Sequence, residues 1–162
     1  MVGALARFNL NADKLSPGAK AVAALFGLAP VCSNSFMNSV AQVVECVHAV
    51  EDSMAIIDAV LKQGLVIEDC PAVQARAGRG VSAVEVPRGI LFHDYHFDET
   101  GTCTEANLVI PTNQNHNNIQ LDMEAFLPGL LHKTEKEIEL GLEMLVRAYD
   151  PCISCSTHLV RL

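Results

Sequence analysis

Apolar residues recur at helical spacing through much of the first 64 residues. Residues 36–62 contain no proline or glycine, and their apolar positions lie three or four apart. This spacing predicts one long amphipathic helix, which polar residues 33–35 would cap and Gly64 would end. His48 falls inside this helix, where it is either a metal ligand or, as we favour, an ordinary packed or surface histidine.

A shorter helix is predicted before the long one. Ser16 followed by Pro17 is a typical helix start, with a capping side chain and a proline at the first helical position. The helix would run through the apolar residues that follow and stop near Gly27. The residues before Ser16 are interpreted as a turn-rich segment.

The hydrophobic pattern changes to a period of two after residue 80. Alternating and β-branched residues predict strands at 81–86, 90–97 and 102–110, with turn residues between the second and the third. A small antiparallel meander at 81–110 is the expected arrangement. Residues 66–80, which are interrupted by proline and glycine, are interpreted as the loop before it.

The last part of the chain returns to helical spacing. Residues 111–120 are polar and rich in asparagine, and they are interpreted as a loop. Two helices are predicted at about 118–130 and 133–148, separated near Pro128.

These elements predict a single α+β domain in which long helices pack with a small antiparallel meander. Its parts over residues 1–162 would be a helical region at 1–64, the meander at 81–110, a second helical region at 118–148 and a C-terminal tail at 149–162.

The composition indicates which kinds of partner the chain is suited to bind. Half of the residues are hydrophobic and only 19% are charged, which indicates that some apolar surface belongs to an interface. The net charge of −8 argues against nucleic acid as a partner. No stretch has the length and apolarity of a membrane span, and no secretory leader is recognised, so a cytoplasmic location is expected.

Six cysteines stand at positions 32, 46, 70, 103, 152 and 155. They are interpreted as reduced thiols rather than as a disulfide framework, because a chain of this size and apolar content builds a core without disulfides. The first four are isolated, and each is interpreted as a small buried hydrophobic residue.

The C-terminal tail contains the most reactive side chains. Cys152, Cys155 and His158 are spaced three apart after the last predicted helix. Thiolates and imidazole bind soft or borderline metals such as zinc, copper(I), iron or nickel. A zinc site would need two further ligands, and a thioredoxin-type pair would open a helix rather than follow one. His93 and His96 do not complete the set, since strand alternation places them on opposite faces. The residues alone indicate half of a metal site.

Three motifs lie in the second half of the chain: E-V-P-R-G-I-L-F-H at 85–93, V-I-P-T-N-Q-N at 109–115 and D-P-C-I-S-C-S-T-H at 150–158. In this order they resemble the E-A-P-R-G…H, V-V-P-[ST]-x-x-N and D-P-C-x-x-C-x-x-H motifs of the large, catalytic subunit of nickel–iron hydrogenases. The sequence around them is most similar to the cytoplasmic, cofactor-linked group, whose members reduce methyl viologen, deazaflavin or NAD. The chain would be the C-terminal half of such a subunit.

The resemblance implies a nickel–iron centre whose iron carries two cyanides and one carbon monoxide. Cys152 would be a terminal nickel ligand, and Cys155 a thiolate that bridges nickel and iron. Arg88 would donate charge-assisted hydrogen bonds to one cyanide and crowd the open nickel position. Thr112 would donate to the other cyanide, and Asp150 would hold Arg88 in place.

The resemblance also implies supporting residues around that centre. His93 closes the motif at 85–93, while an apolar wall would be formed by Pro87, Val109, Ile110 and Pro111. A magnesium ion would be bound by His158 and by the backbone carbonyl of Leu108. With these ligands the tail would be buried at a metal site.

The sequence departs from the family pattern in one respect, which affects the number of metal ligands it can supply. The first cysteine pair of the large subunit, in an R-x-C-G-x-C motif, is absent from the sequence. Half of the thiolates would therefore come from a partner chain that carries the N-terminal half of the subunit. Iron–sulfur clusters would be found only in partner subunits, namely a small subunit and electron-acceptor subunits. The alternative is a non-catalytic hydrogenase-like scaffold or assembly module, whose C-x-x-C tail binds zinc or nothing.

Overall fold

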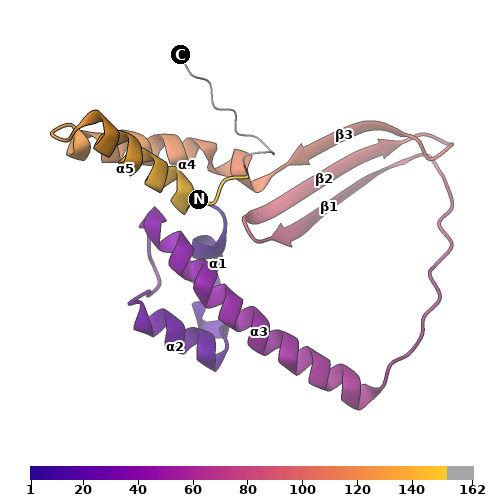
Figure 1. Ribbon diagram of the computed structural model, residues 1–162. Coiled ribbons are helices and arrows are strands. Elements are labelled where there is room, and N and C mark those ends of the chain that lie inside the picture. Colours follow the sequence, from indigo (N-terminus) through magenta and orange to yellow (C-terminus); the bar gives the residue numbers. More distant parts are fainter. Residues whose placement is uncertain (153–162) are drawn as a thin grey trace.

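The computed structural model describes residues 1–152 and has an α+β fold, as predicted. Helices and a sheet form separate parts that meet near the N-terminus (Figure 1). The α-helices are α1 (Ala4–Asn11), α2 (Pro17–Leu25), α3 (Asn38–Gln63), α4 (Pro111–Phe126) and α5 (Glu135–Ala148). Short 3-10 helices span Ala12–Lys14, Ser35–Met37 and Leu127–Leu130.

The sheet is the antiparallel meander predicted from the period of two. Its strands β1 (Gly78–Val86), β2 (Gly89–Phe97) and β3 (Cys103–Val109) lie in the order β1-β2-β3. β1 begins earlier than predicted and includes two glycines that had been interpreted as loop. Glycine is unfavourable within a strand but not forbidden, and here it lies at the end of the sheet far from the helices (Figure 1).

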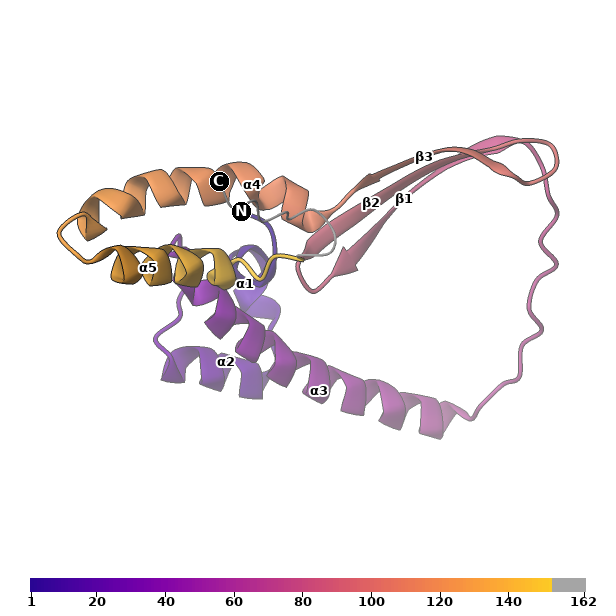
Figure 2. The same cartoon turned by 45° about the horizontal axis from the view of Figure 1, so that its top comes forward.

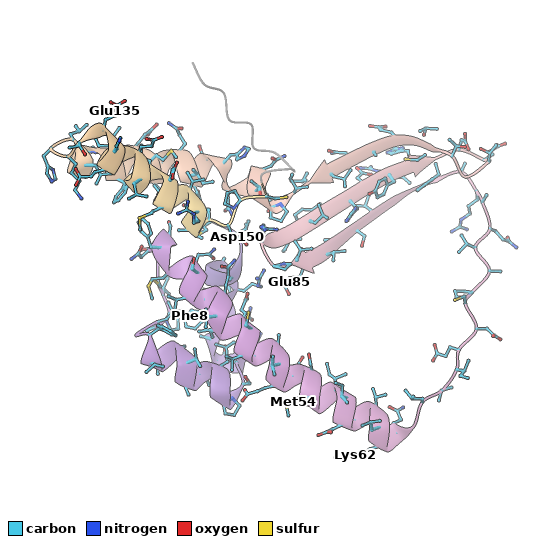
Figure 3. The ribbon with its side chains drawn as sticks, viewed as in Figure 1. Phe8, Met54, Lys62, Glu85, Glu135 and Asp150 are labelled. Carbon is cyan, nitrogen blue, oxygen red and sulfur yellow. The ribbon has the colours of Figure 1, made fainter. Side chains whose placement is uncertain are left out.

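The hydrophobic core lies among α1, α2 and the N-terminal half of α3. Its buried residues are Ala4, Leu5, Phe8, Ala19, Ala23, Leu28, Ala41 and Val44. Beyond this core α3 continues away from the other helices, so Met54 and Lys62 lie on a part of α3 that no other helix covers (Figures 2 and 3). Every residue from Asp52 to Glu85 is exposed.

Two segments interpreted as irregular are helical. Residues 4–11 form α1 rather than a turn-rich segment, because Leu5 and Phe8 are three apart and both enter the core. α4 begins at Pro111 rather than near residue 118, so the whole polar stretch at 111–120 is helix. Proline is favoured at the first helical position, and the buried Thr112 and Asn115 face the protein rather than solvent.

Several further predictions can be compared with the structure. α3 starts and ends close to the predicted positions, and Gly64 follows it with a φ of 87°. Ser16 occupies the N-cap position of α2, yet its side chain makes no capping hydrogen bond. His48 packs against that corner, where its Nδ1 accepts a hydrogen bond of 3.2 Å from the Ser16 backbone N–H. The favoured interpretation of His48 as a packed histidine is confirmed.

The prediction that four isolated cysteines are buried is wrong. Cys46, Cys70 and Cys103 are exposed and Cys32 is half-buried, although all four are free thiols as expected. The reason is that the regions carrying them are not covered by other parts of the described chain. The total accessible surface is 11725 Å², whereas a compact monomer of 17.4 kDa exposes about 7,800 Å².

In the part of the chain that the structure describes, no helix combines the length and the apolar character needed to cross a membrane.

Candidate metal centre

Three chain segments meet where the sheet joins the helices. Pro87 and Arg88 form the two-residue turn between β1 and β2, Pro111 opens α4, and Asp150 follows α5. Figure 3 marks this region by Glu85 and Asp150. Residues from all three sequence motifs are therefore brought together.

Asp150 anchors the guanidinium group of Arg88. Arg88 Nε donates to the Asp150 carbonyl oxygen at 2.7 Å, and Arg88 Nη2 donates to Oδ1 at 3.1 Å. The other carboxylate oxygen, Oδ2, accepts from Gln42 Nε2 at 2.9 Å. The two side chains are 42% and 35% exposed, so their ion pair contributes little stability by itself. Its effect is to fix the direction of the guanidinium group.

Thr112 holds the beginning of the tail. Its Oγ1 accepts a hydrogen bond of 3.0 Å from the Cys152 backbone N–H, and the residue is buried at the first turn of α4. A hydroxyl has one hydrogen to donate as well, so this contact leaves the donor of Thr112 for another acceptor. The sequence contained no signal that Thr112 would bind the backbone of the tail.

The remaining candidate residues differ in how far they are buried. Pro111 is buried, Ile110 is half-buried, and Pro87 and Val109 are exposed. His93 Nδ1 lies 2.9 Å from the Tyr95 hydroxyl, and Leu108 is paired with His93 across the sheet. Cys155 and His158 lie outside the described residues, as does most of the tail, so their metal-binding roles and the burial of the tail stay predictions.

Of the cysteine and histidine side chains predicted to bind metal, only Cys152 lies among the described residues. Among residues 1–152, no group of three or more histidine, cysteine, aspartate or glutamate side chains is arranged to hold a metal ion. Cys152 is disulfide-bonded, so the expectation of reduced thiols is wrong for this residue. Metal ligation by Cys152 would require its reduced, thiolate form.

Sequence reasoning missed a buried polar cluster around Tyr149. The Tyr149 hydroxyl donates to Asp122 Oδ2 at 2.5 Å and lies 3.2 Å from Ser35 Oγ, which also donates to Asp122. Burial, and then the hydrogen bond with Asp122, raise the pKa of Tyr149 to about 12. The cluster ties Tyr149, the residue before Asp150, to α4 and to the 3-10 helix that precedes α3.

We expect Tyr149→Phe to change the alkaline stability of the protein. Because the pKa of Tyr149 is raised from 10.0 to about 12, its stabilising contribution is complete below pH 10 and is lost as the pH rises toward 12. The variant should lose about 1 kcal/mol at neutral pH and lack this decline. Urea unfolding of both proteins at pH 8 and pH 11 measures the difference. An equal decline in the variant would contradict the assignment.

Two buried asparagines fix the N-terminal segment beside the site. Asn115 Oδ1 accepts from Val2 N–H at 2.8 Å, and its Nδ2 donates to the Val2 carbonyl at 3.1 Å. Asn38 Oδ1 accepts from Leu5 N–H at 3.0 Å, while its Nδ2 donates to the Ala148 carbonyl at 2.9 Å. The first residues of the chain are thereby held against α3, α4 and the end of α5.

Comparison with known proteins identifies the family. The family model described as "Nickel-dependent hydrogenase" matches residues 5–158, and the chain belongs to this family. It is 35% identical over 162 residues to sulfhydrogenase 1 subunit alpha of Pyrococcus furiosus, covering 100% of this chain and 37% of that protein. It is 39% identical over 124 residues to the NAD-reducing hydrogenase HoxS subunit beta of Cupriavidus necator, covering 73% of this chain and 25% of that one.

Solved structures support the same fold. The crystal structure of an NAD+-reducing [NiFe]-hydrogenase in the H2-reduced state is similar with a TM-score of 0.73 and 29% identity. That comparison covers 97% of this chain and 35% of the other. The chain thus spans between a quarter and about two fifths of the length of these relatives. The resemblance drawn from the three motifs is confirmed.

Proposed function

We propose that this chain forms the C-terminal part of the catalytic unit of a nickel–iron hydrogenase, which oxidises dihydrogen or reduces protons. The observation that carries the proposal is the convergence of Arg88 and Thr112 on Asp150 and Cys152, the residues on either side of Pro151. Family membership supplies the chemical context for this geometry.

The donor set fits half of a nickel–iron centre. Cys152 and Cys155 would hold the metals as thiolates, with Cys155 bridging them, and the remaining two thiolates would come from the R-x-C-G-x-C segment. When bound, a nickel–iron centre with two cyanides and one carbon monoxide on its iron would supply the redox chemistry that interconverts dihydrogen with protons and electrons. His158 and the carbonyl of Leu108 would bind Mg2+ and pin the tail.

Each of the candidate residues would have a defined task at the nickel–iron centre. Arg88, directed by Asp150, would donate to one cyanide and place a positive charge beside the reacting position. Thr112 would fix the Cys152 backbone and donate to the other cyanide. An apolar wall that excludes water would be formed by Pro87, Val109, Ile110 and Pro111, with His93 behind it. We favour a cysteine sulfur as the proton acceptor, because a guanidinium group stays protonated.

The exposed surface supports a multi-chain assembly. Large apolar residues are exposed along the outer half of α3 and on the sheet, among them Met54, Ile57, Leu61, Val81 and Phe92. Polypeptide that carries the missing thiolates would cover this surface, and the single domain at 1–162 would be completed by it. A small subunit would hold the iron–sulfur clusters and pass electrons to acceptor subunits. The assembly would be cytoplasmic.

Infrared spectroscopy with metal analysis tests the proposal. The complex is purified under reducing conditions from its native source. Cyanide and carbonyl stretching bands, with nickel and iron near one each per chain, are expected. Absence of these bands, with zinc or no metal bound to the tail, would instead identify a non-catalytic scaffold.

A further inference from the structure

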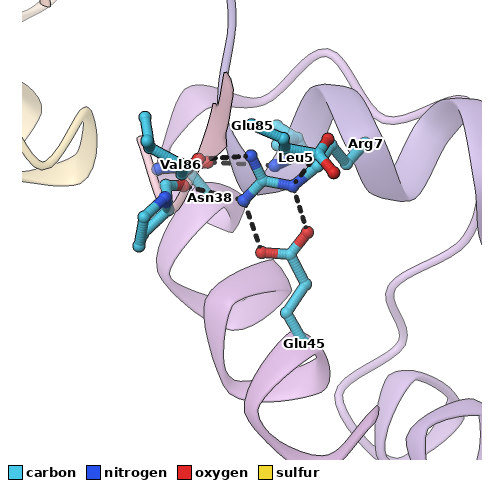
Figure 4. Close-up of polar contacts among 7 residues, drawn as sticks. Leu5, Arg7, Asn38, Glu45, Glu85 and Val86 are labelled. Carbon is cyan, nitrogen blue, oxygen red and sulfur yellow. Dashed lines mark hydrogen bonds and ion pairs between the residues drawn. The ribbon is translucent and has the colours of Figure 1, made fainter. Parts of the chain in front are cut away.

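Arg7 of α1 contacts the turn that carries Arg88. Its Nη1 donates to the Val86 carbonyl at 3.0 Å, and its Nη2 donates to the Pro87 carbonyl at 2.7 Å. Both accepting carbonyls belong to the two residues immediately before Arg88 (Figure 4). Arg7 is far from this turn in the sequence, so the contact joins the helical core to the hairpin.

The same guanidinium group is fixed from the opposite side by Glu45 of α3. Arg7 Nε donates to Oε1 at 2.6 Å and Nη2 donates to Oε2 at 2.7 Å, which makes a bidentate pair (Figure 4). The side chains of Arg7 and Glu45 are 19% and 28% exposed, so this pair is more shielded than that of Arg88 and Asp150. The hydrogen bond with Glu45 raises the pKa of Arg7, and the group stays charged. A bidentate arginine has a defined direction as well as a charge.

The hairpin turn needs support from outside. Val86 pairs with Gly89, so Pro87 and Arg88 alone form the loop. Two-residue hairpins favour primed turns, which require a positive φ at the first central residue. Proline cannot adopt a positive φ, and Asp150 is the one non-glycine residue with positive φ among residues 1–152. The turn is therefore not of the type whose twist matches the strands, so contacts from outside the hairpin can contribute to its shape.

The N-terminal segment supplies more of these contacts. Gly3 lies directly under the turn, where a Cβ atom would be 3.2 Å from the Arg88 carbonyl oxygen. Gly89 lies equally close to the segment, since a Cβ atom there would be 2.8 Å from Val2 Cγ2 and 3.1 Å from Pro111 Cβ. Arg7 thus provides the polar part of a support whose backbone part is Val2 and Gly3.

We propose that Arg7, held by Glu45, is a positioning residue that sets the backbone of the Pro87–Arg88 turn and thereby aims the Arg88 guanidinium group at the metal centre. This inference rests on the proposed function. Arg7 acts through the turn and has no role as a ligand or proton carrier.

The variant Arg7→Lys tests the inference in the assembled complex. Lysine keeps the positive charge beside Glu45, but its single ammonium group cannot serve a carboxylate and two carbonyls in the arginine geometry. We expect nickel and iron to be retained, the cyanide stretching bands to shift, and dihydrogen oxidation to fall about tenfold in kcat. Hydrogen–deuterium exchange of the turn amides at 86–90 should become faster.

Two further variants make the test specific. Arg79→Lys is the matched control, because Arg79 forms a bidentate pair with Asp94 at 2.8 and 2.6 Å at the far end of the sheet. It should leave the cyanide bands and the exchange of the turn amides unchanged. Glu45→Gln keeps the bonds from Arg7 to the carbonyls and should give a smaller shift in the same direction, which provides a result if Arg7→Lys does not fold.

The outcomes separate the inference from the proposed function. Cyanide bands that are present in the unaltered complex and identical in Arg7→Lys, with unchanged exchange at the turn, would refute the positioning role alone. A complex without cyanide bands would refute the proposed function and, with it, the positioning role. Shifted bands and faster exchange in Arg7→Lys, but not in Arg79→Lys, would support both.

Discussion

A Cys152→Ser chain should give a complex that retains about a tenth or less of the nickel of the unaltered protein. A serine hydroxyl is protonated at ordinary pH, so it cannot replace a soft thiolate as a ligand. The backbone contact from residue 152 to Thr112 does not involve the side chain and should survive. Loss of metal would therefore reflect the missing sulfur and not a displaced tail. Metal analysis of the complex, purified under reducing conditions, measures this result.

Cys103→Ser is the control for this experiment. Cys103 is an exposed free thiol on β3, and its sulfur donates only to the Glu105 carbonyl within its own strand. Nickel content should be unchanged in this variant. If the Cys152→Ser complex kept its full nickel content, Cys152 would not be a ligand and the proposed centre would be wrong.

Arg88→Lys should leave the metals bound and lower hydrogen uptake on the order of 100-fold. Arginine binds the Asp150 carbonyl and carboxylate through two nitrogens, and this leaves other N–H groups for the centre. Lysine offers one ammonium group, which can contact Asp150 or the centre but cannot reproduce the fork. The expected effect is therefore on turnover and not on assembly. Hydrogen-uptake assays normalised to nickel measure it.

Arg147→Lys separates this role from a general effect of charge. Arg147 lies on the exposed side of α5, 3.9 Å from Glu143, and makes an ordinary surface ion pair. Its replacement should leave uptake unchanged. Full hydrogen uptake by the Arg88→Lys complex would show that the guanidinium group is not needed, and the role assigned to Arg88 would be wrong.

The elements with a strong and simple periodicity were predictable from the sequence. α3 and the three strands lie close to the predicted ranges, because a long run without proline or glycine and a period of two each allow one regular structure. The contact of Arg88 with Asp150 was expected from the resemblance and is present. Family motifs are local in sequence, so they identified the pieces of the site before their arrangement was known.

Features that depend on distant contacts were not predictable. α1 is only eight residues long, and its two large buried side chains, Leu5 and Phe8, do not establish a period by themselves. α4 is polar in sequence, and its helical start is stabilised by contacts of Thr112 and Asn115 with segments far along the chain. The bonds from Arg7 to the hairpin carbonyls carry no sequence signature, since any side chain with a hydrogen-bond donor can bind a backbone carbonyl.

The uncovered stretch from Asp52 to Glu85 has a consequence for the life of the chain in a cell. Within this stretch, residues 64–77 are exposed and lie outside helices and strands, which is typical of backbone that proteases cleave, and exposed apolar residues promote aggregation. In the proposed assembly, a copy of this chain without the covering polypeptide should therefore be degraded faster than an assembled one. The amount of this chain in the cell should then follow the amount of its proposed partners, because unassembled copies are removed.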